Sequence, residues 1–307
     1  MEETLTPQAA ASLLQAISEG TGIEESVSTK TLLALAEMAL DLNRIEICER
    51  LALTGHEKAS FDEDKESMAW ALFLTARVKL TDTLERIEEA RLEEQEIHID
   101  AGLMGALQEA RVAAEELEDL RLIGNIDQLE GIHHRAIGDI VGARDAFVRS
   151  LASKEETEDI LGTANSLHSL GEIAMDQEEF EDALAFFERA AETYENADEM
   201  LECAHAMSLC SHALIQIDRL DEAKNKLETA LDIGKENDDE STQIVAHWGL
   251  ADLGHLTQDI GLELENLQAA VVLFIHLERP VPEALRIRLD QMIDSLEAQE
   301  RHANHEE

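Results

Sequence analysis

Apolar residues recur along this chain at the spacing of an α-helix, and the same arrangement of apolar stripes returns every forty residues. The clearest unit is residues 164–196, ANSLHSLGEIAMDQEEFEDALAFFERAAETYEN. Two stripes mark its two helices: Leu167, Leu170, Gly171 and Ala174, then Phe180, Ala183, Phe187 and Ala190. We predict a helix-turn-helix pair in which Gly171 and Ala183 allow the helices to approach closely, while Phe187 fills the seam between them.

Other parts of the chain follow the same pattern at shifts of forty residues. These units are residues 124–156, 204–236 and 244–276, with residues 29–60 as a looser match. A polar turn divides each pair at one fixed offset: Asn43-Arg44, Gly138-Asp139, Glu178-Glu179, Asp218-Arg219 and Gln258-Asp259. Self-similarity of this kind is typical of repeat proteins, so we predict that the pairs stack side by side.

Residues 64–120 match the pattern poorly. Residues 68–80 have the stripe of a first helix and residues 103–114 that of a second, with a charged helical stretch between them at residues 86–96. We interpret this segment as one atypical pair that contains an elongated or inserted helix.

The two ends are predicted to be helices outside the repeat. Thr6 can cap and Pro7 can begin a helix within residues 5–19. Pro280 and Pro282 interrupt the last repeat. One apolar stripe then marks a capping helix over residues 283–300: Leu285, Leu289, Met292, Ile293 and Leu296. Residues 301–307 are expected to be a disordered tail, which leaves residues 1–300 as a single solenoid domain.

Composition supports an all-α fold. The chain has three prolines and only 3% aromatic residues, which disfavours a β-sheet. The apolar runs are too short to span a membrane, and the sequence starts with acidic rather than basic residues, so we expect neither a membrane segment nor a secretion signal. The three scattered cysteines fit a reducing, cytoplasmic setting.

The charge is strongly negative, with 68 acidic residues against 24 lysines and arginines and a net charge of -44. Contacts to phosphates need lysine and arginine, so we expect no nucleic-acid partner. Two explanations of the acidic excess stay open. One is halophilic adaptation to a cytoplasm whose salt screens the repulsion, and the other is a basic protein partner that neutralises it.

The unit at residues 164–196 resembles the tetratricopeptide repeat in its spacing and residue types. That repeat has a standard period of about 34 residues, and the longer period here is similar to the variant in Pins-type polarity scaffolds and MalT-type regulatory domains. The resemblance implies a right-handed α-solenoid of about six helix-turn-helix pairs with a C-terminal capping helix. We expect the extra residues to lengthen the second helix of each pair and the loop after it. His134, Gly254 and Glu263 depart from the family pattern, which has tyrosine at the first two places and alanine at the third.

The same resemblance implies a concave groove lined by the first helix of each pair. The expected partner-binding residues are Asn125, Gln128, Arg135, Asn165, His168, Glu172, His205, Ser208, His212, Trp248, Asp252 and His255. Trp248 is either an anchor for a peptide or a packing residue. The histidines are ordinary polar contacts, pH-sensitive groups or metal ligands, and we predict no metal site because no tight ligand signature occurs. The central groove lacks lysine and contains Glu172 and Asp252, which favours a ligand that carries arginine or lysine.

These features favour a non-catalytic scaffold or adaptor that binds a peptide or helix of a partner protein in its groove. The alternative is the sensory or regulatory arm of a signalling or transcription-control system, and a metal-binding enzyme on a helical solenoid is the third hypothesis. The sequence has neither a phosphate-binding glycine loop nor a GxSxG motif, and Cys48 and Cys210 fall on core stripes. We therefore expect no catalytic residues and no cofactor.

Overall fold

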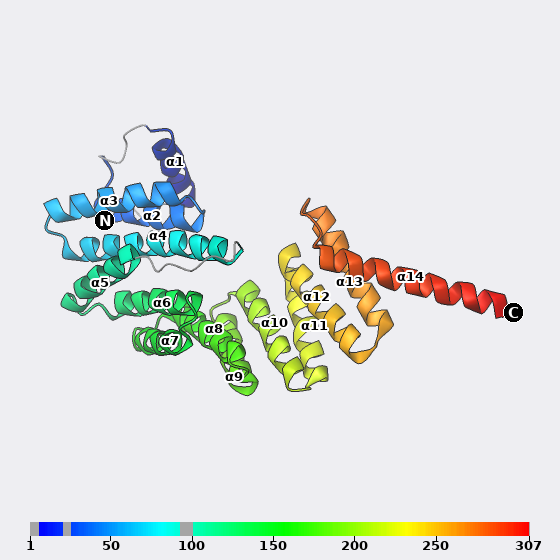
Figure 1. Ribbon diagram of the computed structural model, residues 1–307. Coiled ribbons are helices and arrows are strands. Elements are labelled where there is room, and N and C mark those ends of the chain that lie inside the picture. Colours follow the sequence, from blue (N-terminus) through cyan, green and yellow to red (C-terminus); the bar gives the residue numbers. More distant parts are fainter. Residues whose placement is uncertain (1–5, 21–25, 93–100, 307) are drawn as a thin grey trace. The chain divides into compact units, whose positions relative to one another are not determined.

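The computed structural model describes residues 6–20, 26–92 and 101–306, and within these ranges it contains fourteen helices and no strand (Figure 1). The all-α fold predicted from the sequence is confirmed. The helices group into two compact units, Met1–Asp159 and Ile160–Glu307. Each unit is described by itself below, and the single solenoid domain over residues 1–300 stays a prediction.

The first unit holds one short helix and three helix pairs. Its helices are α1 (Pro7–Ser18), α2 (Thr29–Asp41), α3 (Ile45–Phe61), α4 (Lys65–Leu92), α5 (Ala101–Glu116), α6 (Leu120–Ala136) and α7 (Ile140–Glu156). Thr6 caps α1, because its Oγ1 accepts a hydrogen bond of 3.3 Å from the backbone N–H of Ala9. Each helix packs on the next, and the first helices α2, α4 and α6 also pack on one another, as in a repeat stack.

The atypical segment contains one long helix. α4 has 28 residues, and its buried side chains continue as far as Ile87. The charged stretch predicted at residues 86–96 is therefore, as far as Leu92, a continuation of this helix. Residues 93–96 lie outside the described residues.

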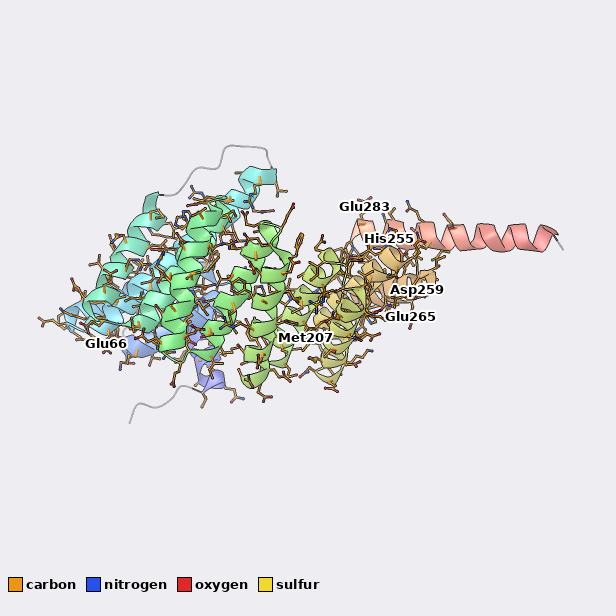
Figure 2. All side chains as sticks on the ribbon, turned by 90° about the horizontal axis from the view of Figure 1, so that it is seen from below. Glu66, Met207, His255, Asp259, Glu265 and Glu283 are labelled. Carbon is orange, nitrogen blue, oxygen red and sulfur yellow. The ribbon has the colours of Figure 1, made fainter. Side chains whose placement is uncertain are left out.

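The second unit holds three helix pairs and a final helix. Its helices are α8 (Ile160–Asp176), α9 (Phe180–Asn196), α10 (Met200–Gln216), α11 (Leu220–Glu236), α12 (Glu240–Thr257), α13 (Ile260–His276) and α14 (Glu283–Glu306). α14 packs on α13 and then extends away from the other helices of this unit, as Figure 1 and Figure 2 both show. It continues through most of residues 301–307, where the sequence predicts a disordered tail, because no proline or glycine after Pro282 ends it.

The repeat consists of two equal halves, which corrects the expectation that the extra residues lengthen the second helix and its loop. From α6 to α13 a helix begins every twenty residues, at residues 120, 140, 160, 180, 200, 220, 240 and 260. Most of these helices have 17 residues, and three-residue turns separate them from α6 to α12. α12 has 18 residues, and a two-residue turn joins it to α13. The turns within and between pairs close alike: the N–H groups of Glu179 and Asp239 donate to the carbonyls of Ala174 (2.9 Å) and Gly234 (2.8 Å). Both helices of a pair therefore contribute equally to the forty-residue period.

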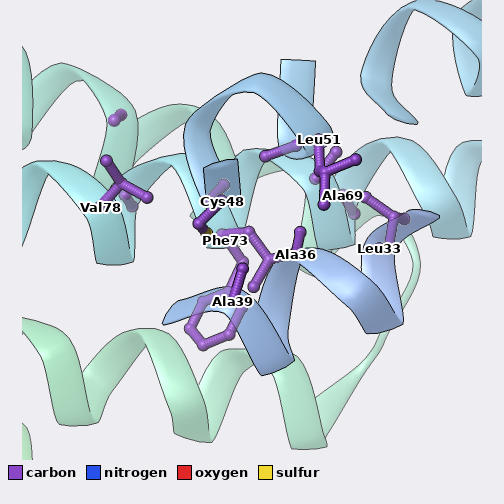
Figure 3. Packing of buried hydrophobic residues seen from close by; sticks show 14 of the residues in the cluster. Leu33, Ala36, Ala39, Cys48, Leu51, Ala69, Phe73 and Val78 are labelled. Carbon is purple, nitrogen blue, oxygen red and sulfur yellow. The ribbon is translucent and has the colours of Figure 1, made fainter. Parts of the chain in front are cut away.

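The predicted contact between a glycine and a phenylalanine occurs in two helix pairs, α6–α7 and α8–α9. A Cβ atom on Gly171 would lie 2.5 Å from the ring of Phe187, which is too close for any other residue. Gly131 meets the ring of Phe147 in the same way. Near the start of the chain, aliphatic side chains of α2, α3 and α4 surround Phe73 instead (Figure 3). The absence of a side chain on the first helix is what lets an aromatic ring fill the seam.

Candidate functional site

The residues predicted to bind a partner are divided between the two units. Asn125, Gln128 and Arg135 lie on α6 in the first unit. The other predicted residues lie on α8, α10 and α12, the first helices of the three pairs in the second unit. We refer to the surface formed by α8, α10 and α12 as the first-helix face of the second unit.

Predicted residues on neighbouring first helices touch one another on this face. The ring of His168 on α8 stacks on the ring of His205 on α10, with centroids 5.3 Å apart and planes 19° apart. The ring of His168 is also nearly perpendicular to the ring of Phe187, with centroids 6.0 Å apart and planes 81° apart. The two histidines therefore form one continuous strip of side chains across α8 and α10.

His212 extends the strip along α10. Its side chain is accessible to solvent, but the surrounding protein atoms remove enough water to lower its pKa. The negative charge of Asp252 on α12 opposes this shift, and His205 adds to it.

Two of the predicted residues already have partners in the fold. Ser208 is buried, and its hydroxyl donates to the carbonyl of Ala204 on its own helix at 3.0 Å. Asn165 is exposed, but its Oδ1 accepts a hydrogen bond of 2.5 Å from the hydroxyl of Tyr194. Burial raises the pKa of Tyr194 to about 12, so its hydroxyl keeps its proton and remains a donor. Ser208 is thus a packing residue, and Asn165 has the N–H groups of its side-chain amide to offer a ligand.

At α12 the first-helix face meets the final helix. Trp248 is half-buried against the cluster that contains Leu267 and Leu285, the second of which lies on α14. Asp252 accepts a hydrogen bond of 2.5 Å from Arg288 of α14. The packing alternative for Trp248 is therefore the one that these contacts favour, while His255 remains exposed beside α14 (Figure 2).

In the first unit, an ionic cluster is centred on two acids of α6, the helix that carries three of the predicted residues. Asp127 is almost fully buried and accepts hydrogen bonds of 2.8 Å from both Arg111 on α5 and Arg149 on α7. Both arginines also bond to Glu130, at 3.1 and 3.0 Å. The sequence analysis did not predict this cluster. Arg111 and Arg149 lie on other helices than the acids that they neutralise, and apolar periodicity does not reveal such contacts.

Gln128 faces inward rather than toward a ligand. Its Oε1 accepts from the hydroxyl of Ser150 at 3.2 Å and from Nζ of Lys154 at 3.5 Å. Burial lowers the pKa of Lys154 to about 8, with Asp159 and Asp127 opposing the shift. Asn125 and Arg135 are half-buried on the same helix.

A cavity of about 400 Å³ lies between the first helices α2, α4 and α6. Apolar and charged side chains share its wall: Lys30, Leu33, Ala34, Glu37, Glu66, Ser67, Trp70, Asp119, Arg121 and Leu122. Trp70 stacks on Phe73 with their centroids 5.1 Å apart, which holds the indole at the cavity. Sequence reasoning missed Trp70 because it falls in the segment that matches the repeat poorly, although it is one of two tryptophans in the chain.

The described residues form neither a metal-binding cluster nor a reactive thiol. Among these residues, no three histidine, cysteine, aspartate or glutamate side chains are placed to hold a metal ion together. Burial raises the pKa of Cys48 to about 11 and that of Cys210 to about 12, so both keep their protons near neutral pH. None of the described helices has the length and apolar character needed to cross a membrane.

Comparisons with known proteins agree with this architecture. Residues 162–236 match the model of the tetratricopeptide repeat family. The apo form of RapI has a TM-score of 0.72 and 13% identity, over 90% of this chain and 72% of that one. BtubC from P. vanneervenii has a TM-score of 0.58 and 16% identity, over 84% of this chain and 95% of that one. No curated protein matches the sequence.

A third similar structure is the signal-transduction ATPase PH0952 from Pyrococcus horikoshii, which has a tetratricopeptide repeat sensor. Its TM-score is 0.51 at 11% identity, and the match covers 96% of this chain but only 50% of that one. The fold and the matched residues define a helical-repeat protein of the tetratricopeptide type. This fold is associated with protein–protein interaction and regulation, and the sequence resemblance to the repeat is confirmed.

Proposed function

We propose that this protein is a non-catalytic scaffold of the cytoplasm that binds a peptide or helix of a partner protein on the first helices of its repeats. The cavity between α2, α4 and α6 carries the proposal, because three consecutive first helices line it. Its volume of about 400 Å³ suits the entry of a few partner side chains. Trp70 offers the aromatic surface that commonly anchors such contacts.

The charge of the chain supports a partner with basic side chains. Glu37, Glu66 and Asp119 are the acids in the cavity wall, against the two bases Lys30 and Arg121. On the second unit, Glu172 and Asp252 lie on the first-helix face. A net charge of -44 attracts a basic segment from a distance before these local contacts form. Halophilic adaptation explains the same charge without a partner, so the response to salt separates the two.

The test is capture of a partner from the cells that make the protein, at several salt concentrations. Glu66→Lys reverses a charge in the cavity wall, and we expect it to reduce capture at least tenfold. Trp70→Ala should do the same by removing the anchor. Glu116→Lys is the matched control, because Glu116 is also exposed but lines a different cavity, between α3, α4 and α5. Equal capture by Glu66→Lys and the wild type, or equal loss with Glu116→Lys, would count against the proposal.

The alternative of a sensory or regulatory arm uses the same surface. PH0952 is described as having a tetratricopeptide repeat sensor, which supports keeping this alternative. A sensor is expected to bind a small peptide and change conformation, whereas a scaffold holds a folded partner with little change. Small-angle scattering of the captured complex, before and after partner release, distinguishes the two.

A further inference from the structure

An acidic cradle lies where α12, α13 and α14 meet in the second unit. It consists of the carboxylates of Asp252 and Glu263, the carbonyl of Ala251 and the imidazole of His255. Arg288 of α14 occupies it: Nε lies 2.6 Å from Glu263 Oε1, Nη1 2.5 Å from Asp252 Oδ1 and Nη2 2.9 Å from the Ala251 carbonyl. One guanidinium thus satisfies acceptors on two helices.

Two residues at the cradle, Gly254 and Glu263, depart from the repeat pattern. A Cβ atom on Gly254 would lie 2.6 Å from the backbone nitrogen of Glu263, so only glycine lets α12 and α13 approach this closely. Glu263 occupies the place where the other repeats have the small buried residues Ala143, Ala183 and Ala223. Its side chain is only 8% exposed. A carboxylate this buried needs a cation beside it.

α14 is held to the rest of the unit by few other contacts. Among its side chains from residue 283 to residue 295, Leu285 is the buried one, at 2% exposure. Leu289 and Met292 are partly buried against the same cluster. Before α14 the chain passes through the non-helical segment that contains Pro280 and Pro282. One apolar contact region and one arginine therefore fix the helix.

The cradle also determines what can replace α14. If α14 leaves, Glu263 and Asp252 lose the one arginine or lysine with which the described structure pairs them. His255, whose Nδ1 is 3.2 Å from Glu263 Oε1, compensates only when it is protonated. The released surface therefore consists of two uncompensated carboxylates beside the apolar side chains of Trp248 and Leu267. Only a segment with a cation next to an apolar stripe restores both contacts.

We infer that the acidic cradle is a docking site for an arginine-bearing amphipathic helix of a partner protein, and that α14 occupies it as an intramolecular substitute. The inference rests on the proposed function in that the partner is a protein. It adds the chemistry of the partner and a regulatory contact, since partner binding at this place requires displacement of α14.

The test uses the full chain and a fluorescent synthetic peptide of residues 280–295 as the probe. In the wild type, tethered α14 is present at an effective concentration in the millimolar range, so the free peptide is excluded. Arg288→Glu in the full chain repels α14 from the cradle, and we expect this variant to bind the peptide at least tenfold more tightly than the wild type. Leu285→Ala is a second, milder variant that releases α14 without changing a charge.

Two altered peptides test the chemistry. A peptide with Arg288→Ala should bind the Arg288→Glu chain about thirtyfold more weakly, because it leaves the buried carboxylates unpaired. A peptide with Arg286→Ala loses the same charge from an exposed position on the same helix and should bind unchanged. Equal weakening by both peptides would mean that attraction is non-specific and would overturn the inference.

Two further results would overturn it. One is no peptide binding by either released chain while its helical circular dichroism is intact. The other is a wild-type dimer that becomes a monomer with Arg288→Glu, which would mean that α14 is exchanged between copies and the occupant is not a partner protein. Because the probe is part of this chain, failure here leaves the capture experiment with Glu66→Lys unaffected.

Discussion

Residues 124–156 in the first unit and residues 164–196 in the second have the same helix lengths and the same contact between a glycine and a phenylalanine. They differ on the side of the first helix that packs on neighbouring helices. The second has the buried apolar residues Leu167 and Leu170, where the first has Asp127 and Glu130. A repeat of this type therefore tolerates acids at apolar positions.

The condition for this tolerance is an arginine from outside the first helix. Asp127 is paired with Arg111 from the preceding pair and with Arg149. Glu263 in the last repeat is paired with Arg288 from the final helix. The arginine always reaches the acid from another helix, either from the same pair, as Arg149 does, or from a neighbouring element, as Arg111 and Arg288 do. The buried acids consequently make each such repeat dependent on one particular neighbour.

The largest expected difference between the two repeats comes from breaking the ionic cluster. Arg111→Ala leaves the buried carboxylate of Asp127 with only one of its two arginine partners. We expect the free energy of unfolding to fall by about 3 kcal/mol or more. Arg149→Ala should cost only about 1 kcal/mol, because Arg149 is 50% exposed. Urea titration measures both.

A double variant sharpens this comparison. Arg111→Met with Asp127→Leu gives the first repeat the apolar character of Leu167, and it should recover most of the loss. If the double variant is no more stable than Arg111→Ala alone, the ionic cluster is not what distinguishes the two repeats.

The next effect should be the same in both repeats. Gly131→Ala and Gly171→Ala each force a methyl group against a phenylalanine ring, and we expect a cost of about 1–3 kcal/mol in each. Gly105→Ala on α5 is the control, since no atom lies within 4 Å of its added Cβ. It should stabilise the helix by roughly 0.5–1 kcal/mol. A cost at only one of the two repeats would show that the shared seam differs after all.

A smaller effect depends on pH. Burial and the neighbouring His134 lower the pKa of His133 below its usual 6.5, and its Nδ1 has no hydrogen-bond partner in the described structure. The unfolded chain then binds more protons below about pH 6.5 than the folded one. The contribution of His133 to the free energy of unfolding is therefore fully present above about pH 6.5, and it is lost as the pH falls toward the lower pKa of the folded state. His133→Phe should make the melting temperature less sensitive between pH 7.5 and pH 5, and unchanged sensitivity would contradict this.

The smallest effect concerns one turn position that the two repeats fill differently. Gly138 and Glu178 both have a left-handed backbone, with φ of 83° and 59°. Glutamate is strained in this conformation and also places a negative charge at the C-terminal end of a helix. We expect Glu178→Gly to stabilise the protein by about 0.5–1 kcal/mol, and Gly138→Glu to destabilise it by a similar amount in thermal unfolding. Equal effects of the same sign would contradict this.

The sequence predicts the repeat well because the contacts that define it are local. Gly171 and Phe187 belong to one pair, sixteen residues apart, and apolar periodicity indicates both of their helices. The equal halves of the repeat escaped prediction, since turns such as Asp198 and Asp238 adopt a left-handed backbone without glycine to mark it.

The site was less predictable because its contacts join separate repeats. Glu263 is visible in the sequence as a departure, but Arg288 lies 25 residues further on and beyond two prolines. The repeat position of Ser208 suggests a ligand contact, whereas its hydroxyl bonds to its own helix. Position in a repeat therefore identifies the helix of a residue, and leaves the burial and the partners of its side chain undetermined.

The central claim is that a partner protein contacts the first helices of the pairs. Photo-crosslinking tests it directly, with a photoreactive amino acid placed at Glu66 and at His205 on first helices, and at Val141 and at Glu192 on second helices, all of them exposed. We predict partner crosslinks from Glu66 and His205 and none from the other two positions. Crosslinks from Val141 or Glu192 in place of these would contradict the account.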